Sequence, residues 1–112
     1  MSQLTTHILD TTIGKPAQGV HIQLEQNVSG QWIPLAKGKT NTDGRISDLL
    51  PTDKILNIGV YRLIFDTGSY FKSQNCKSFY PSVSIEFEIT DASHYHVPLL
   101  LNPFGYSTYR GS

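Results

Sequence analysis

Short segments in which apolar and polar side chains alternate are the feature that most limits the fold of this chain. Residues 82–90, SVSIEFEIT, place Val, Ile, Phe and Ile at every second position, and residues 19–26, GVHIQLEQ, do the same with Val, Ile and Leu. Successive side chains of a strand point to opposite faces, so both segments are expected to be strands buried on one face. Residues 4–11, LTTHILDT, alternate more weakly, with Thr5 and His7 on the less apolar face.

Further strands are expected between clear turn signals. These strands are residues 31–40, 59–66 and 94–101, followed by a last extended piece at 105–112. The strand at 59–66 is expected to be buried largely on both faces. Turns are expected at 27–30 and 41–44, and a loop at 14–16. Pro34 has no N–H to donate, which places residues 31–40 at a sheet edge or a bulge. Seven or eight strands at spacings of about 8–12 residues predict an all-β, antiparallel sandwich.

Composition supports strands over helices. Val, Ile and Thr account for 5, 10 and 10 of the 112 residues, whereas Ala occurs three times. Branching at Cβ favours a pleated sheet over a helical turn. Only one short helix is expected, over residues 68–77, with Thr67 as its N-cap. With no composition shift or repeat along the chain, residues 1–112 are expected to form a single domain.

Charge and cysteine content exclude several classes of function. Nine Lys and Arg balance nine Asp and Glu, so the basic excess of a nucleic-acid-binding protein or a polybasic membrane anchor is missing. No apolar run approaches the ~20 residues of a spanning helix, and MSQLTTHILD does not resemble a signal peptide. A single cysteine, Cys76, cannot form an internal disulfide. We therefore expect a cytoplasmic protein without nucleic-acid or membrane partners.

Four histidines are the first candidates for chemistry, because imidazole has an unperturbed pKa of about 6.5. His21 is interpreted as a solvated residue on the polar face of its strand. His94 and His96 share a face, and His7 could join them if residues 4–11 and 94–101 lie side by side. These three fit plain strand histidines, a catalytic pair, or a metal site, although the sequence offers too few further ligands for zinc.

Arg45 and the last residues are further candidates. Arg45 directly follows the turn at 41–44, where it fits either a solvated strand start or a clamp on an anion or carbonyl. The tail carries Phe104, Tyr106 and Tyr109. Such a tail has two interpretations. It packs on the sandwich or on a partner subunit, or it forms the wall of a binding site in which Tyr109 stacks on a flat ligand. Cys76 is interpreted as structural.

Five blocks of this sequence resemble the transthyretin-like family. They are THILDT, KPAQGVHIQL, TNTDGR, HYHVPLLL and the final YRGS, and together they run from about residue 4 to the last residue. The YRGS tetrapeptide is similar to the enzyme branch of that family, the 5-hydroxyisourate hydrolases, rather than to its hormone carriers.

The resemblance implies a fold, an assembly and an activity. The fold is a two-sheet β-sandwich of about eight strands with one short helix, assembled as a homotetramer, a dimer of dimers, with active sites between the dimers. The activity is hydrolysis of 5-hydroxyisourate, a cyclic amide of urate degradation, without metal or organic cofactor. The implied catalytic residues are His7, Arg45, His96 and Ser112, and the implied substrate-binding residues are His7, Arg45, Tyr109, Arg110 and Gly111. Either His7 or His96 is the general base, and His94 has a supporting role.

Two other classes of function stay open beside the hydrolase. One is a transthyretin-like carrier that binds a small ligand without catalysis. The other is a sandwich that serves protein interaction, which predicts a monomer with an exposed apolar patch.

Overall fold

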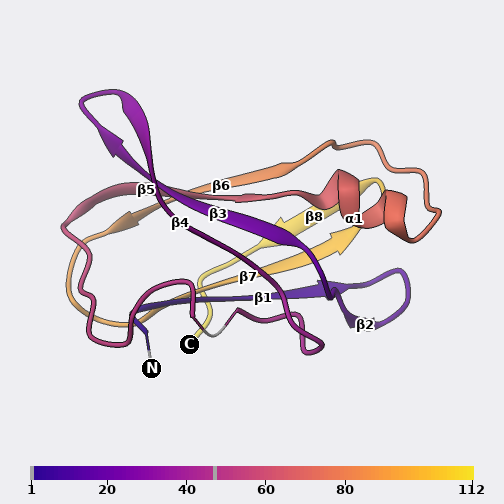
Figure 1. Cartoon of the computed structure of the whole chain (residues 1–112), viewed down its shortest axis with the longest axis horizontal. Helices are drawn as coiled ribbons and strands as arrows, with labels where there is room; N and C mark the ends of the chain where they lie inside the picture. The colour runs from indigo at the N-terminus through magenta and orange to yellow at the C-terminus, as the bar shows by residue number, and fades with distance from the viewer. Residues whose placement is uncertain (1, 47) are drawn as a thin grey trace.

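Two four-stranded sheets and one helix make up the computed structural model, which describes residues 2–46 and 48–112 (Figure 1). The first sheet has the order β2-β1-β7-β8 and the second the order β4-β3-β5-β6. The elements are β1 (Leu4–Asp10), β2 (Lys15–Pro16), β3 (His21–Val28), β4 (Gln31–Lys39), β5 (Gly59–Phe65), α1 (Thr67–Ser73), β6 (Val83–Ile89), β7 (Tyr95–Asn102) and β8 (Gly105–Thr108). The predicted two-sheet sandwich with one short helix is confirmed.

The core lies between the sheets and follows the alternation of the sequence. In β1 the side chains of Leu4 and Ile8 are buried, whereas Thr5 and His7 are half-buried on the opposite face. Strands β3 and β6 contribute their predicted apolar faces in the same way. Strand β5 differs from expectation on its second face, because Arg62 and Ile64 are only half-buried there. Thr5 and His7 therefore lie outside the core, whereas Thr6, Asp10 and Glu25 are polar residues of β1 and β3 that are buried.

One strand pair departs from the expected antiparallel arrangement. Strand β1 runs parallel to β7, with Thr5 opposite His96 and His7 opposite Pro98. The other strand pairs are antiparallel in the part of the chain that is described. Turn signals predict only hairpins between neighbours, whereas β1 and β7 are separated by most of the chain. This parallel pair is what aligns Thr5 and His7 with the residues around His96.

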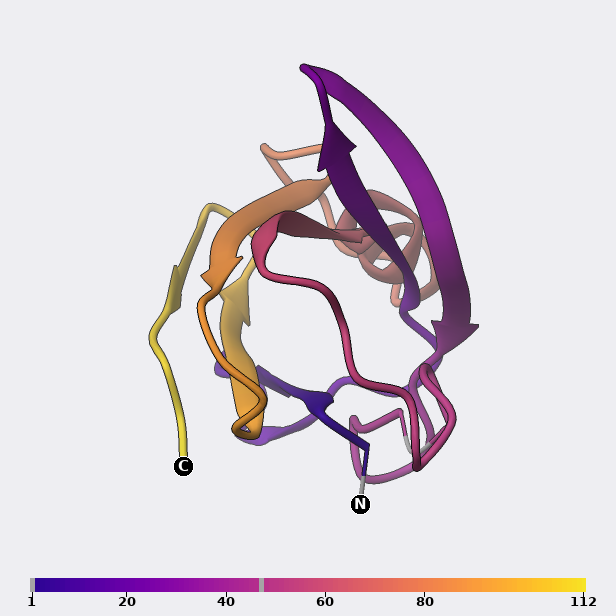
Figure 2. The same cartoon turned by 90° about the vertical axis from the view of Figure 1, so that its left-hand side faces the viewer.

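The position of Pro34 in the sheet agrees with what its missing N–H predicts. Strand β4 is an edge strand, and its register against β3 shifts where Pro34 lies opposite Glu25. Both positions predicted for Pro34, an edge and a bulge, are thus confirmed together. The expected loop at residues 14–16 contains the two-residue strand β2, which pairs with the end of β1. Viewed from the side, β6 and β8, each an edge strand of its own sheet, lie on the same side of the sandwich (Figure 2).

The helix is shorter than expected and begins with a different cap. The carboxylate of Asp66 accepts a hydrogen bond from the backbone N–H of Ser69 at 3.3 Å, so Asp66 and not Thr67 is the N-cap. Thr67 is the first residue of the helix and is buried. The helix ends at Ser73 rather than at residue 77. Its Tyr70 hydroxyl donates to the buried carboxylate of Asp10 at 2.7 Å, which ties the helix to β1.

Candidate active site

The parallel pair of β1 and β7 forms the floor of a cavity of about 610 Å³ on the outer face of the first sheet. His96 in β7 and His94, directly before β7, line this cavity, as does Thr5 in β1. Residues that line the cavity include Thr5, Asn41, Arg45, His94, His96, Tyr109, Gly111 and Ser112. Segments from the beginning, middle and end of the chain therefore meet at one place.

Arg45 is held at this cavity by a tightly closed turn. The Asn41 side-chain carbonyl accepts hydrogen bonds from the backbone N–H of Asp43 at 2.9 Å and of Arg45 at 3.1 Å. A backbone bridge then joins Arg45 to His7. Gly44 has φ +71°, and a Cβ there would lie 2.4 Å from the carbonyl oxygen of Ile8. Only glycine allows this approach of the turn to β1, which brings Arg45 beside His7.

The tail is docked rather than free. Strand β8 pairs with β7, and beyond it the N–H of Gly111 donates to the carbonyl of His96 at 2.9 Å. A Cβ on Gly111 would lie 2.5 Å from Cδ2 of His96, so the backbone of Gly111 lies directly against that ring. Tyr109 borders the cavity with 60% of its surface exposed. The tail therefore packs on the sandwich, as the first interpretation predicted, and also forms one wall of the cavity, whereas stacking of Tyr109 on a flat ligand stays a prediction.

Electrostatics in the site favour neutral imidazoles. Partial burial, and next the nearby Arg45 guanidinium, lower the pKa of His7 below its usual value of 6.5. The same two causes lower the pKa of His96, with smaller contributions from His94 and His7. A neutral ring keeps one nitrogen free to accept a proton at pH 7. His7, His96 and Arg45 thus form one electrostatic group, in which both imidazoles are favoured in their neutral form.

Arg110 lies apart from this group. Its guanidinium stacks over the Tyr95 ring at 4.2 Å and donates to the carbonyl of His94 at 3.2 Å. It lines a neighbouring cavity of about 300 Å³, between β6 and the tail, and not the cavity that Arg45 borders. These contacts with Tyr95 and His94 fix the tail on the sandwich. Binding of substrate by Arg110 stays a prediction.

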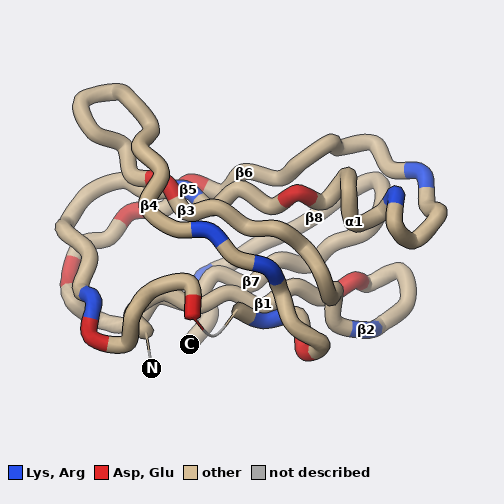
Figure 3. The backbone as a smooth tube through the Cα atoms, in the orientation of Figure 1, with Lys and Arg blue, Asp and Glu red and all other residues tan. Residues whose placement is uncertain are grey.

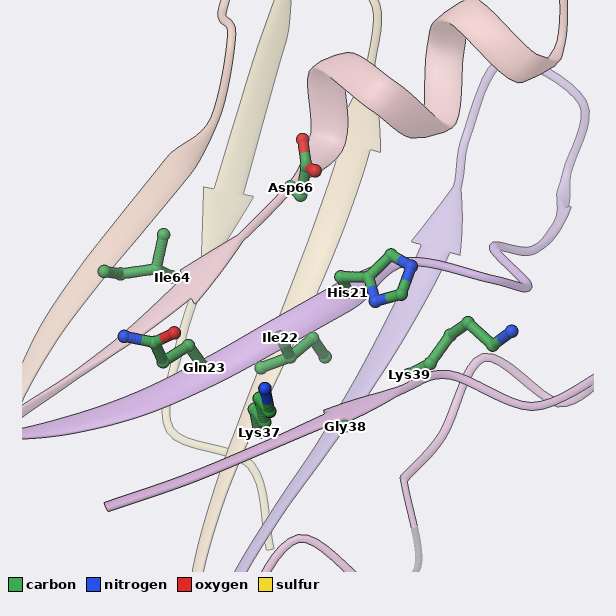
Figure 4. A pocket seen from close by; sticks show the side chains of 8 residues that line it. All are labelled: His21, Ile22, Gln23, Lys37, Gly38, Lys39, Ile64 and Asp66. Carbon is green, nitrogen blue, oxygen red and sulfur yellow. The ribbon is translucent and has the colours of Figure 1, made fainter. Parts of the chain in front are cut away.

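A second groove lies on the outer face of the other sheet (Figure 4). It has a volume of about 590 Å³ and is lined by neighbouring strands, with His21, Lys37, Lys39 and Asp66 as its polar residues. His21 is exposed, as predicted. Asp66 is already engaged as the helix cap, and no second histidine borders the groove. It lacks the paired bases of the first cavity.

In residues 2–46 and 48–112 there is no group of three or more His, Cys, Asp or Glu side chains that could hold a metal. Over the same residues no helix is long and apolar enough to cross a membrane. Positive and negative residues are interspersed along the backbone (Figure 3). Cys76 is a half-buried free cysteine beside the core.

Comparison with known proteins gives the family. A family model described as the HIUase/Transthyretin family matches residues 4–111. The chain belongs to the HIUase/transthyretin family. A 5-hydroxyisourate hydrolase of Salmonella dublin is 51% identical over 110 residues, which cover 97% of this chain and 80% of that one.

Solved structures of the HIUase/transthyretin family share the fold. Klebsiella pneumoniae 5-hydroxyisourate hydrolase has a TM-score of 0.87 at 40% identity, over 99% of this chain and 100% of that chain. Sea bream transthyretin in complex with thyroxine has a TM-score of 0.91 at 33% identity, over 97% and 94% of the two chains. One neighbour is thus named as an enzyme and the other binds a hormone, so within the HIUase/transthyretin family the fold alone does not decide between enzyme and carrier.

Two residues of this cavity, Thr5 and Asn41, were not predicted as site residues from the sequence. The hydroxyl of Thr5 lies 2.8 Å from Nδ1 of His96 and 3.0 Å from Nε2 of His94. Asn41, read only as part of a turn, supplies the side chain that fixes the backbone of Arg45. The alternation already placed Thr5 on the face of His7, but only the register of β1 against β7 shows that Thr5 contacts His96.

Proposed function

We propose that this chain hydrolyses 5-hydroxyisourate to 2-oxo-4-hydroxy-4-carboxy-5-ureidoimidazoline, in the degradation of urate to allantoin. One observation carries the proposal: Arg45 and His96 line one cavity together with the docked YRGS tail. His7 does not line that cavity, but it adjoins it through its backbone bridge to Arg45 and lies near enough to affect the pKa of His96. The curated relatives named as 5-hydroxyisourate hydrolases support it at 44–51% identity over nearly the whole chain. A hormone carrier needs a more apolar lining than two histidines, an arginine and an asparagine provide.

The reaction needs a base, and the histidines can supply it. Water attacks a ring carbonyl of the flat substrate while a neutral imidazole, His7 or His96, takes its proton. The ring C–N bond then breaks, and the imidazolium just formed gives its proton to the leaving nitrogen, directly or by relay through the other imidazole. The former carbonyl carbon becomes a carboxylic acid, which loses its proton to solvent. The lowered pKa of both rings keeps them unprotonated and competent at neutral pH.

Arg45 has a separate task in this proposal. Negative charge develops on the carbonyl oxygen when water adds, and a fixed guanidinium stabilises that charge better than mobile water does. Removing one such donor typically costs about 2.7–4 kcal/mol of transition-state stabilisation. The closed turn at Asn41–Arg45 supports this role, because it fixes the backbone from which the guanidinium extends.

The tail completes the proposed substrate site. Tyr109, exposed over the cavity, stacks on or holds the flat ring, and the hydroxyl of Ser112 binds a polar edge of the substrate or the attacking water. Gly111 permits close approach to His96, and Arg110 fixes the tail from behind. No metal or organic cofactor takes part in the proposed reaction.

We further propose the setting in which the site works. The chain acts as one transthyretin-like domain in a cytoplasmic homotetramer, a dimer of dimers, with the cavity facing the neighbouring dimer. The open side of the cavity and the exposed Tyr109 support an assembly that covers them. A covered cavity excludes bulk water and strengthens the electrostatic effect of Arg45.

The deciding experiment follows the ultraviolet absorbance of freshly generated 5-hydroxyisourate with and without the protein. We expect decay faster than the spontaneous rate, lost in His7→Ala and in Arg45→Ala. His21→Ala is the matched control, because this histidine is exposed on the other sheet, and it should retain full activity. A well-folded protein that leaves the decay at its spontaneous rate would contradict the proposal and favour the carrier.

A further inference from the structure

The side chain of Thr5 lies between two histidine rings. Its Oγ1 is 2.8 Å from Nδ1 of His96 and 3.0 Å from Nε2 of His94, both within hydrogen-bond distance. The two rings are nearly parallel, with an interplanar angle of 19° and centroids 6.4 Å apart. Thr5 is also the direct Cα partner of His96 in the parallel β1–β7 pair. The hydroxyl is therefore held by the sheet and not by a mobile loop.

A shared hydroxyl couples the protonation of the two rings. A threonine hydroxyl carries one proton, so it donates to one ring and accepts from the N–H of the other. His96 can act as a base toward the cavity when its Nδ1 carries the proton and donates to Oγ1 of Thr5. Oγ1 of Thr5 then donates its own proton to Nε2 of His94.

This arrangement decides which nitrogen of His96 can act as a base. A neutral imidazole carries one proton, so a proton on Nδ1 leaves Nε2 with its lone pair available to the cavity. The opposite tautomer would place an N–H there, and that nitrogen could not take a proton from water. Hydrogen bonding at the second nitrogen commonly sets the tautomer of a functional histidine.

We propose that Thr5, supported by His94, is a positioning residue that holds His96 in the tautomer and orientation in which Nε2 faces the substrate. The inference rests on the proposed hydrolase function and adds to it a residue outside the histidine, arginine and tail set. When Nε2 takes a proton, the imidazolium keeps its Nδ1–H bond to Thr5, so the ring does not need to reorient during the reaction.

Two substitutions separate the hydroxyl from the shape of the side chain. Thr5→Val keeps the branched Cβ and removes the hydroxyl, whereas Thr5→Ser keeps the hydroxyl and removes a methyl group. We expect Thr5→Val to lower kcat about 10- to 100-fold, as removal of a partner that orients a metal-ligating histidine does, with little change in KM. Thr5→Ser should restore most of the loss.

The matched control is Thr11→Val. The Thr11 hydroxyl also donates from the β1 side to β7, to the carbonyl of Leu101 at 3.1 Å, but far from the cavity. Its loss tests what removing a hydroxyl at the β1–β7 junction does to stability alone, and we expect kcat to stay at the wild-type value. Thermal unfolding of all variants shows whether a loss of activity reflects unfolding.

A second readout does not depend on the substrate. Proton–nitrogen correlation spectra of isotope-labelled protein identify the protonated nitrogen of each neutral histidine. We expect His96 to be protonated at Nδ1 in the wild type and in Thr5→Ser, and to shift toward Nε2 in Thr5→Val. An unchanged tautomer in a folded Thr5→Val protein would overturn the inference even if the protein is a hydrolase. A protein without hydrolase activity would overturn the proposed function while these spectra still report on Thr5.

Discussion

At the scale of single residues, the histidines make activity depend on pH in a defined direction. Burial and Arg45 lower the pKa of both His7 and His96 below 6.5. A base works only while unprotonated, so kcat/KM should fall on acidification with a midpoint below pH 6.5. Arg45→Gln removes the charge and should move that midpoint upward, toward 6.5, in addition to lowering the rate. A wild-type midpoint above 6.5 in the pH profile of kcat/KM would contradict this assignment.

Gly111 is a second residue whose effect can be foreseen from geometry. A Cβ at this position would lie 2.5 Å from Cδ2 of His96, closer than side chains pack, so Gly111→Ala must displace the ring or the tail. Misplacement of a catalytic group by about 1 Å can lower turnover by about 10²-fold. The matched control is Gly105→Ala in the same tail, where the nearest atom would be 3.7 Å away. Steady-state kinetics should show the loss only for Gly111→Ala.

At the scale of elements, the turn before Arg45 should matter for stability and activity together. Gly44→Ala combines a left-handed φ of +71° with a clash against the carbonyl of Ile8. A left-handed conformation of this kind costs on the order of 1–3 kcal/mol for other residues. Gly19 has φ +83° and open space around it, so Gly19→Ala measures the dihedral cost alone. We expect urea unfolding to show a larger loss for Gly44→Ala, and kinetics to show a loss of activity there only.

The tail is an element whose removal should separate function from folding. After β8 it is joined to the sandwich mainly by the Gly111 bond to His96 and the contacts of Arg110, and it contributes nothing to the buried core. Deleting Tyr109–Ser112 should therefore bring turnover near the spontaneous rate and lower the melting temperature by a few degrees at most. If the shortened chain failed to fold in circular dichroism, the tail would be a packing element first.

These elements also show what the sequence could and could not predict. Alternation placed His7 and Thr5 on one face and His94 with His96 on another strand, because side-chain direction is a local property of a strand. The packing of the whole sandwich determines that the two strands are neighbours and run parallel. The sequence could therefore predict that the histidines converge only on the condition that these strands lie side by side. Asp66 and Thr67 are both good cap residues, and their order in the helix depends on where the chain leaves β5. The position of Arg110 behind the tail has no local signal.

At the scale of the whole molecule, we predict a tetramer of about 50 kDa, four copies of 12.5 kDa. Phe104 is 66% exposed and Tyr109 60%, which leaves large apolar surfaces uncovered in a single chain. The edge strands β6 and β8 lie on the same side of the sandwich and can pair with a second copy (Figure 2). Light scattering during gel filtration gives the mass, and a monomer would favour the protein-interaction alternative.

Assembly should also control the rate, which gives the tetramer a functional test. Tyr109 borders the cavity that His96 lines and is 60% exposed, so a single chain leaves the reaction exposed to bulk water. A neighbouring copy over this opening would exclude water and strengthen the effect of Arg45 on the developing charge. Specific activity should therefore stay constant on dilution until the tetramer dissociates, and then fall together with the mass. Full activity at concentrations where only monomer is present would show that one chain contains the complete site.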